Sequence, residues 1–187
     1  MGGAKCYQHL PFKVLGVGME KGKVESEDQN RTSFQCMDAI EISLFIEKEG
    51  LFFYESVGKK VKDPRIQEMF SRLAGEEREH IQSLQEKSRY LQPAIAGRGR
   101  PKEYLSRFIK EELKGKIFPA LNSTSPKEIQ TDKQALDLGI ESERRSIEIL
   151  GGLLEKEKKL DVKAIFSHLL VEEKKHLLML QELKAKL

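Results

Sequence analysis

Two pairs of glutamate and histidine occur at matching positions in the two halves of this sequence. Glu77 precedes His80 by three residues, and Glu173 precedes His176 by three residues. Each pair follows a further glutamate 30 residues upstream, so that the complete set is Glu47, Glu77, His80, Glu143, Glu173 and His176. Four carboxylates and two imidazoles are the ligand set of a site for two metal ions. A single pair would be weak support for such a site, and the repetition is what makes it specific.

The two halves superimpose after a shift of 96 residues without any insertion. Apolar and polar residues both stay in register, as in Ala39 with Ala135, Phe70 with Phe166, Ser71 with Ser167, Leu73 with Leu169, and Glu76 with Glu172. A repeat of this length indicates a duplicated helical hairpin whose two copies share one task.

The register also separates candidate ligands from neighbouring charged residues. Glu49, Glu141 and His168 lie near the candidates, but their repeat partners are Arg145, Phe45 and Arg72. None of these partners repeats a metal-binding side chain, so we exclude the three residues as ligands. The alternative interpretation is that all the glutamates are surface charges and the histidines are core residues, and the paired register makes it the weaker one.

The apolar periodicity predicts four long helices, which must position these side chains. We expect residues 1–36 to be an N-terminal extension of poor order and residues 37–187 to be one bundle. Within the bundle we expect long helices at about 38–62, 64–90, 126–157 and 161–186, and a crossover at 91–125 with a short helix at about 102–117.

The positions of the turns agree with the positions of the ligands. In an antiparallel hairpin, residues equally far from the turn lie at the same height. The midpoint between Glu47 and His80 falls at Asp63-Pro64, which is a helix start signal, and the second midpoint falls beside Asp161. At 1.5 Å per residue, the ligands lie roughly 22 to 25 Å from each turn. The expected fold is therefore an all-α antiparallel four-helix bundle of two repeated hairpins with its ligands at one level.

Four carboxylates in an apolar core would repel one another and lose hydration, at a cost of several kcal/mol each without compensation. Two divalent cations would supply that compensation. Carboxylates with imidazoles suit iron or manganese better than zinc, which favours thiolates.

Composition excludes several other functions. The net charge is only +3, and lysine and arginine alternate with glutamate, so we expect no nucleic-acid binding. Cys6 and Cys36 are the only cysteines and form neither a disulfide framework nor a Cys-x-x-Cys site. We identify no signal peptide and no stretch of the ~20 apolar residues that span a membrane. We therefore expect a cytoplasmic protein without a membrane partner.

Residues 38–187 resemble the ferritin-like di-iron carboxylate proteins, and most of all the rubrerythrin diiron-binding domain. The matching segments are EKEGLFFY (47–54), LAGEEREH (73–80), IESERRSIE (140–148) and LLVEEKKH (169–176). The resemblance implies two iron ions, with manganese or a mixed pair as alternatives. It also implies roles for the ligands: terminal carboxylates from Glu47 and Glu143, bridging carboxylates from Glu77 and Glu173, and nitrogen ligands from His80 and His176.

The resemblance places Tyr54 beside the metals as a hydrogen-bond donor. Two departures from the family matter. Full rubrerythrins carry a Cys-x-x-Cys iron site, which this sequence lacks, so we expect a separate electron donor such as a rubredoxin-like protein. They also carry a glutamate at the position of Ser146, so we do not expect their redox-linked ligand exchange.

The leading functional hypothesis is an oxidoreductase that reduces peroxide or oxygen, acting as a homodimer. The alternatives are a ferroxidase that feeds an iron store, a non-enzymatic bundle with structural metals, and an oxygenase for an organic substrate. For the last of these the sequence offers no pocket signature.

Overall fold

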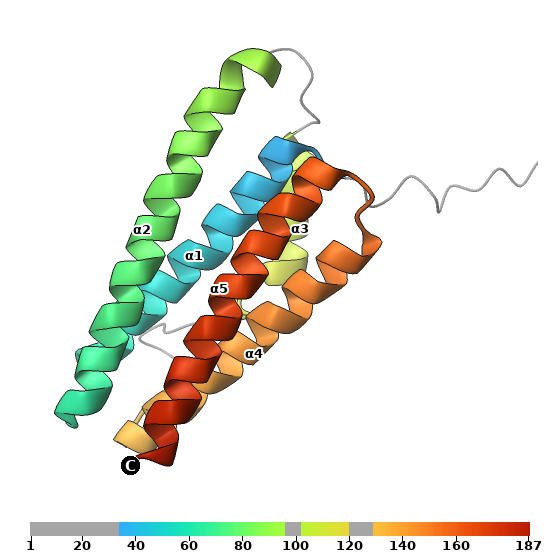
Figure 1. The fold of residues 1–187 in the computed structure, drawn as a ribbon. Coiled ribbons are helices and arrows are strands. Elements are labelled where there is room, and N and C mark those ends of the chain that lie inside the picture. Colours follow the sequence, from blue (N-terminus) through green and yellow to red (C-terminus); the bar gives the residue numbers. More distant parts are fainter. Residues whose placement is uncertain (1–33, 96–101, 120–128) are drawn as a thin grey trace, which may run out of the picture. The chain divides into compact units, whose positions relative to one another are not determined.

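The protein is described by a computed structural model that covers residues 34–95, 102–119 and 129–187, and these residues contain helices and no β-strand. Its long helices are α1 (Cys36–Gly58), α2 (Pro64–Ile95), α4 (Asp132–Lys156) and α5 (Leu160–Ala185), which run side by side in Figure 1. A shorter helix α3 (Lys102–Phe108) continues into a single π-helical turn, η1 (Ile109–Leu113).

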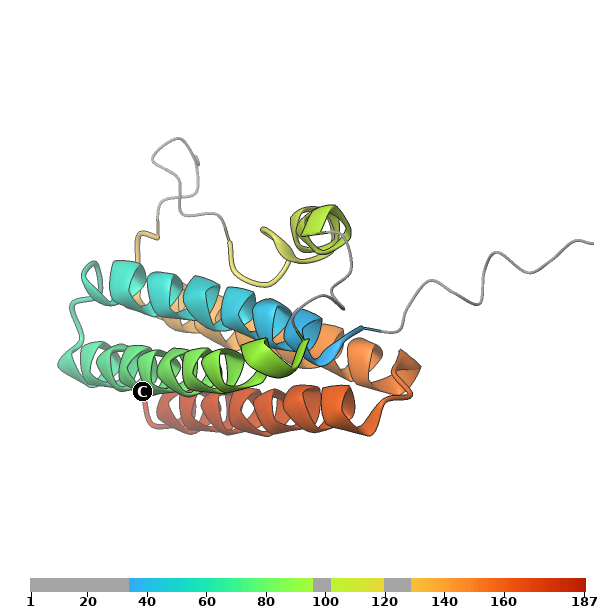
Figure 2. The same cartoon turned by 90° about the horizontal axis from the view of Figure 1, so that it is seen from above.

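The long helices form two hairpins, α1 with α2 and α4 with α5. Helix α5 also packs against α1, and this contact joins the two hairpins. Helices α2 and α5 touch each other much less. Helix α3 lies on the α1 side of the bundle, away from α5 (Figure 2). This arrangement confirms the predicted all-α bundle of two hairpins with a short helix in the crossover.

The core explains why these segments form helices that pack together. Apolar residues recur three and four positions apart and face inward, so each helix buries one stripe. The largest fully buried side chains come from every long helix and from the crossover, and include Phe53, Tyr54, Phe70, Leu113, Ile117, Leu136 and Phe166.

The loop at 59–63 is held by the other hairpin. The Asp132 carboxylate, at the start of α4, accepts hydrogen bonds from the backbone N–H groups of Lys62 (3.0 Å) and Asp63 (2.6 Å). The Asp63 side chain in turn accepts from the N–H of Arg65 at 2.9 Å and so caps α2. These hydrogen bonds hold the loop of the α1–α2 hairpin beside the start of α4.

Several helix boundaries differ from those expected. Helix α1 ends at Gly58 instead of near residue 62, and α2 continues to Ile95 instead of ending near residue 90. Helix α4 begins at Asp132 instead of near residue 126, because Thr131 forms a capping box with Gln134 and residues 129–130 are not helical. The crossover helix is divided into α3 and η1, and it ends at Leu113 instead of residue 117.

The core also begins earlier than expected. Phe34, which the sequence analysis assigned to the N-terminal extension, is only 3% exposed and packs against Phe108 and Phe166. Its N–H donates to Glu157 at 2.9 Å, and its carbonyl accepts from the Lys159 ammonium group at 2.9 Å. We call these contacts the Phe34 clamp. Cys36, also assigned to the extension, is the first residue of α1, and residues 1–33 lie outside the described residues.

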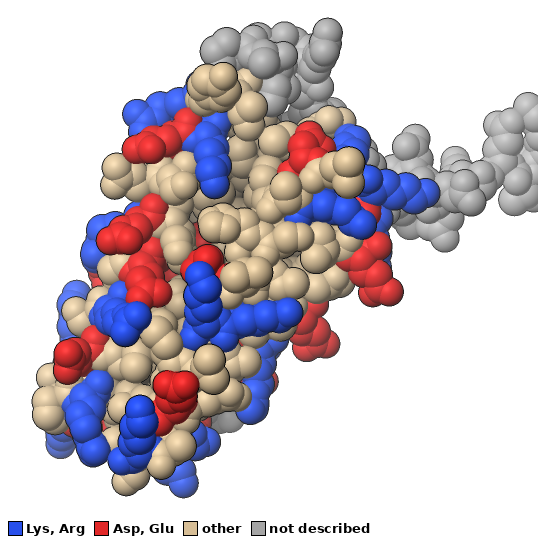
Figure 3. Space-filling view, in the orientation of Figure 1, with Lys and Arg blue, Asp and Glu red and all other residues tan. Residues whose placement is uncertain are grey.

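Charges of both signs are mixed on the surface. Figure 3 shows lysine, arginine and acidic side chains interspersed on the face that α2 and α5 form. Within the described ranges, no helix has the length and apolar character needed to cross a membrane.

The Phe34 clamp makes a testable contribution to stability. We expect Glu157→Ala to lower the free energy of unfolding by about 1–3 kcal/mol, because buried amide groups would lose their acceptor. Urea unfolding followed by circular dichroism measures the change. Glu155→Ala, at an exposed position two residues earlier, is the control. Equal unfolding free energies for the two variants would contradict the clamp.

Candidate metal centre

The six predicted ligands come from all four long helices. Helix α1 supplies one glutamate, α4 supplies another, and α2 and α5 each supply a Glu-x-x-His pair. On α2 and on α5, residues three apart share one face, so both members of a pair point inward. The structure thus brings the residues of the two hairpins to one level of the bundle interior.

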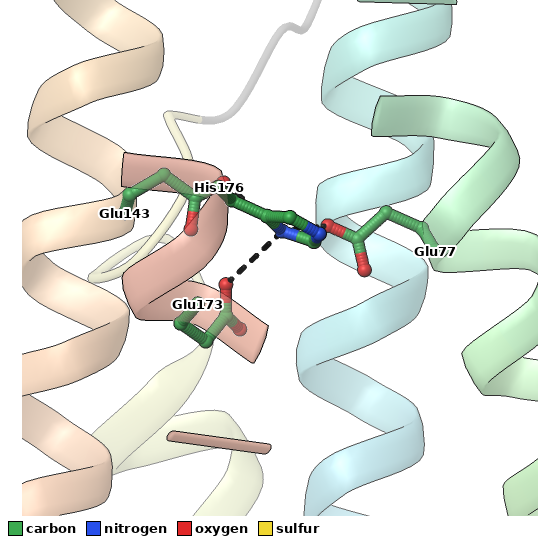
Figure 4. A group of neighbouring side chains, drawn as sticks. All are labelled: Glu77, Glu143, Glu173 and His176. Atoms are coloured by element: carbon green, nitrogen blue, oxygen red, sulfur yellow. Dashed lines mark ion pairs between the residues drawn. The ribbon is translucent and has the colours of Figure 1, made fainter. Parts of the chain in front are cut away.

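The ligand atoms form two groups that share one residue. Glu77, Glu143, Glu173 and His176 form the first group, and Glu47, Glu77 and His80 form the second, with the atoms of each group within 4.8 Å of one another. In Figure 4, the His176 ring lies between the carboxyl groups of the first group. Glu77 belongs to both groups, as a bridging carboxylate should. Glu173, for which the resemblance implies the same role, belongs only to the group around His176.

The burial of the six candidate ligands, and the polar atoms they leave without a hydrogen bond, show whether these residues suit metal ions. Five of the six are at most 2% exposed. Eight buried side-chain nitrogen or oxygen atoms of the described residues have no hydrogen-bond partner, and six of them belong to the candidate ligands: Glu47 Oε1, Glu77 Oε2, Glu143 Oε2, Glu173 Oε2, His176 Nδ1 and His176 Nε2. Unpaired atoms of this kind are costly unless they have another partner, and two cations would be that partner. The residues present therefore fit a pair of metal ions, and metal binding by them stays a prediction.

Hydroxyl groups hold two of the carboxylates. The Tyr54 hydroxyl donates a hydrogen bond to Glu143 Oε1, and the Ser146 hydroxyl donates to Glu173 Oε1 at 2.7 Å. Burial and the Glu143 carboxylate raise the pKa of Tyr54 well above 10, so its hydroxyl keeps its proton. Tyr54 and Ser146 are thus hydrogen-bond donors to Glu143 and Glu173, and a place for Tyr54 beside metal ions, which the resemblance implied, stays a prediction.

Each histidine also faces a carboxylate from the opposite hairpin. His176 Nδ1 lies 3.4 Å from Glu77, while its Nε2 lies 3.4 Å from Glu76. His80 Nδ1 lies 3.3 Å from Glu47, while its Nε2 lies 3.9 Å from Glu172. A carboxylate behind a histidine fixes the orientation of the ring when the other nitrogen binds metal. Sequence reasoning missed this role, although Glu76 and Glu172 are repeat partners and that register was its signal.

Gly50 and Phe118 shape the space around Glu77, and sequence reasoning missed both. A Cβ atom at Gly50 would lie 2.9 Å from Glu77 Oε1 and 3.2 Å from Phe118 Cζ. Phe118 reaches this position because the crossover turns at Gly115, whose φ of +73° suits glycine, and then enters the core. The crossover therefore covers the cluster on the side of α1.

The three residues excluded from the ligand set belong to neither ligand group. Glu141 forms an ion pair with Arg145 at 3.2 Å, and its side chain is 47% exposed. Glu49 is half-buried. His168 is exposed, and it lines a cavity that also contains Glu47 and His80.

The cluster holds protons in the absence of metal. Burial raises the pKa of Glu77 and of Glu143 well above 4.5, and neighbouring carboxylates add to the rise. Burial acts in the same direction on Glu173, but interactions with Glu143 and His176 outweigh it and lower its pKa. Burial opposes the charged form of His176, yet the Glu173 and Glu143 carboxylates outweigh burial and raise its pKa from 6.5 to about 9. At neutral pH, metal ions would have to displace these protons.

Comparisons with known proteins relate this geometry to a family and to a fold. The rubrerythrin family profile matches residues 38–184, which include all six predicted ligands. Among solved structures, the chain is similar to the bacterioferritin-related protein of Bacteroides fragilis, described as a dodecameric thioferritin. The identity is 20% and the TM-score 0.55, over 84% of this chain and 89% of that one, which supports the ferritin-like fold. The comparison with curated proteins gave no match.

The raised pKa values predict how the stability of the metal-free protein depends on pH. Protonation of Glu77 and Glu143 stabilises the fold fully below pH 4.5, and this contribution is lost as pH rises through their folded pKa values. The contribution of His176 is lost between pH 6.5 and about 9. We therefore expect the melting temperature of the metal-free protein to fall between pH 6.5 and 9. A melting temperature that rises over this pH range would contradict the raised pKa values.

Metal addition at pH 7 should release protons, which calorimetry in buffers of different ionisation enthalpy measures.

Gly50 provides a second test. We expect Gly50→Ala to weaken metal binding by about 10- to 100-fold, because the added methyl group displaces the Glu77 carboxylate. Gly152→Ala, on α4 with no atom within 4 Å of the added methyl group, is the matched control. Both exchanges favour helix formation by about 1 kcal/mol, but only Gly50→Ala also crowds the core, so urea unfolding of the metal-free variants must show that both are folded before their affinities are compared. Metal titration of the two variants measures the effect, and equal affinities would show that Gly50 makes no room for a ligand.

Proposed function

The chain belongs to the rubrerythrin family, and on this basis we propose that it binds two iron ions and reduces peroxide with electrons from a separate donor. The observation that carries the proposal is the pair of ligand groups that share Glu77 in the centre of the bundle. A shared carboxylate lets two metal ions lie close enough to act on one small molecule. The unpaired buried atoms of the same residues support this interpretation.

When bound, a pair of ferrous ions supplies the two electrons that, with two protons, break the O–O bond of hydrogen peroxide and release two water molecules. The protein residues keep the ligands in place for this chemistry. Tyr54 and Ser146 each donate to one carboxylate oxygen and leave the other oxygen of Glu143 and of Glu173 without a hydrogen bond. These free oxygen atoms are the ones available to metal ions.

Aromatic side chains exclude water from one side of the cluster. The Tyr54 ring packs against Phe53, Phe70 and Phe118, with ring centroids 5.2 to 6.2 Å apart. All four rings are at most 2% exposed. A dry environment strengthens the interactions between the carboxylates and the metal ions and keeps the Tyr54 hydroxyl directed at Glu143.

The metal and the partners belong to the proposal as well. The ligands suit iron, and manganese or a mixed pair would suit the same carboxylates and imidazoles. The sequence contains only two cysteines and no Cys-x-x-Cys pair, so we assign electron delivery to another protein, such as one of rubredoxin type. A homodimer in the cytoplasm completes the proposal.

Iron oxidation for storage is the second candidate function. The structural neighbour with this fold is described as a thioferritin that forms a dodecamer. Storage would require a large hollow assembly, whereas peroxide reduction requires no more than a dimer. Size-exclusion chromatography with light scattering therefore distinguishes the two functions, and a dimer would count strongly against storage.

Anaerobic reconstitution tests the proposed function directly. We expect about two ferrous ions to bind per chain. One equivalent of hydrogen peroxide should then oxidise both ions within seconds, as absorption spectroscopy would show, and added reductant should permit further turnovers. Structural metals without a catalytic role would bind with the same number but would show no turnover with any donor.

Substitution of single ligands identifies the site. We expect Glu77→Gln and Glu173→Gln to lose at least one metal ion, while Glu79→Gln, at an exposed position of α2, should bind iron normally. Glutamine has nearly the same shape as glutamate, so both variants should fold, and circular dichroism of the metal-free proteins checks this before iron is added. Wild-type iron binding in both would refute the assigned ligands.

A further inference from the structure

The metal cluster has one exposed edge. His80 is 21% exposed, whereas His176, its repeat partner, is 1% exposed. A cavity of about 210 Å³ lies at this edge, between α2 and α5, which are at the front of Figures 1 and 3. Glu47 and His80 are part of its lining, so the cavity reaches side chains of the second ligand group.

The residues that line this opening can be compared with those at the equivalent positions in the other half of the repeat. Near His80, the cavity is lined by two small residues, Ser83 of α2 and Ala164 of α5. A shift of 96 residues places Met179 and Glu68 at the equivalent positions around His176. The positions equivalent to Ser83 and Ala164 in the half of the buried histidine therefore carry larger residues.

An ion pair further closes the side of His176. His168, at the rim of the cavity, corresponds to Arg72 in the other half. Arg72 pairs with Glu76 at 2.8 Å, and Glu76 also lies 3.4 Å from His176 Nε2. Phe118 and the crossover cover the cluster on the side of α1. The cavity beside His80 is thus an open approach to the cluster, on the side of the more exposed of the two histidines.

Size and lining indicate which ligand the cavity admits. Pockets for organic molecules of drug size measure about 300–1,000 Å³, so this volume favours a molecule of a few atoms. Its walls combine apolar side chains (Leu84, Ile165, Leu169) with polar and charged ones (Ser83, Lys87, His168, Glu172). Donors and acceptors of hydrogen bonds thus both line the cavity, and a small molecule that donates and accepts, such as hydrogen peroxide, fits this lining.

We propose that peroxide reaches the metal pair from one side only, through the cavity between α2 and α5, and that it meets the metal held by His80 first. The inference rests on the proposed function and adds to it the direction of approach. The asymmetry arises from Ser83 and Ala164, which are small where their repeat partners are large.

Filling the cavity tests this route. A side chain on a helix extends over the preceding turn, so a methionine at position 83 would lie towards His80. We expect Ser83→Met to bind iron normally but to lower the second-order rate constant for oxidation of the ferrous protein by hydrogen peroxide at least about tenfold. Stopped-flow absorption measures this rate. Ala164→Met fills the cavity from the opposite wall and should act in the same way, whereas Ser71→Met, at an exposed position of α2, should have no effect.

A second measurement needs neither metal nor turnover. Diethyl pyrocarbonate acylates accessible imidazoles, and mass spectrometry of peptides identifies the modified residue. In the metal-free protein we expect His80 to react much faster than His176, and both cavity-filling variants to protect His80. Equal reactivity of the two histidines would overturn one-sided access.

The two measurements separate the route from the reaction. Protection of His80 without any reaction with peroxide, in the parent protein as well, would refute peroxide as the ligand and the proposed reduction together. Unchanged peroxide rates in both cavity-filling variants would overturn the route alone. Slower iron loading with an unchanged peroxide rate would instead assign the cavity to the metal cation, and would also overturn the inference.

Discussion

The structure depends on four buried carboxylates and two imidazoles, one buried and one partly exposed, at one level of a helical bundle. Without cations the carboxylates repel one another and lose hydration, and the raised pKa values of Glu77 and Glu143 express that cost. The raised pKa of His176 has the opposite origin, because the Glu173 and Glu143 carboxylates stabilise its charged form. The metal-free protein lowers the cost by retaining protons. Metal ions would replace those protons, so metal binding, proton release and stability are linked in this fold.

The remaining features serve to hold this cluster in place. Hydroxyl groups of Tyr54 and Ser146 orient two carboxylates, and carboxylates from the opposite hairpin lie behind both histidines. Asp132 fixes the loop of the first hairpin, and the Phe34 clamp fixes the start of α1 against the junction of α4 and α5. Gly50 leaves the space that the Glu77 carboxylate occupies. The cluster is therefore positioned by contacts between hairpins as much as by contacts within them.

The duplication accounts for the symmetry of the ligands and also makes the departures from symmetry visible. Both halves keep the Glu-x-x-His pair and the preceding glutamate, because one shared site requires both sets. The surroundings are free to differ. The repeat partner of Ser83 is Met179, and His80, three residues before Ser83, is the histidine that lines the cavity. Two halves with matching candidate ligands can thus differ in how exposed those ligands are.

The helical hairpins, the register between them and the six candidate ligands could be predicted from the sequence alone, because helical periodicity and ligand spacing are local properties that a repeat reinforces. The same register excluded Glu49, Glu141 and His168. The surroundings of the ligands became known with the three-dimensional fold. Phe34, Gly50, Phe118 and the cavity beside His80 depend on contacts between segments far apart in the chain, and no local pattern encodes such contacts. The start of α4 shifted for a different reason: Thr131 and Gln134 form a capping box, a local signal that is present in the sequence but that apolar periodicity does not report.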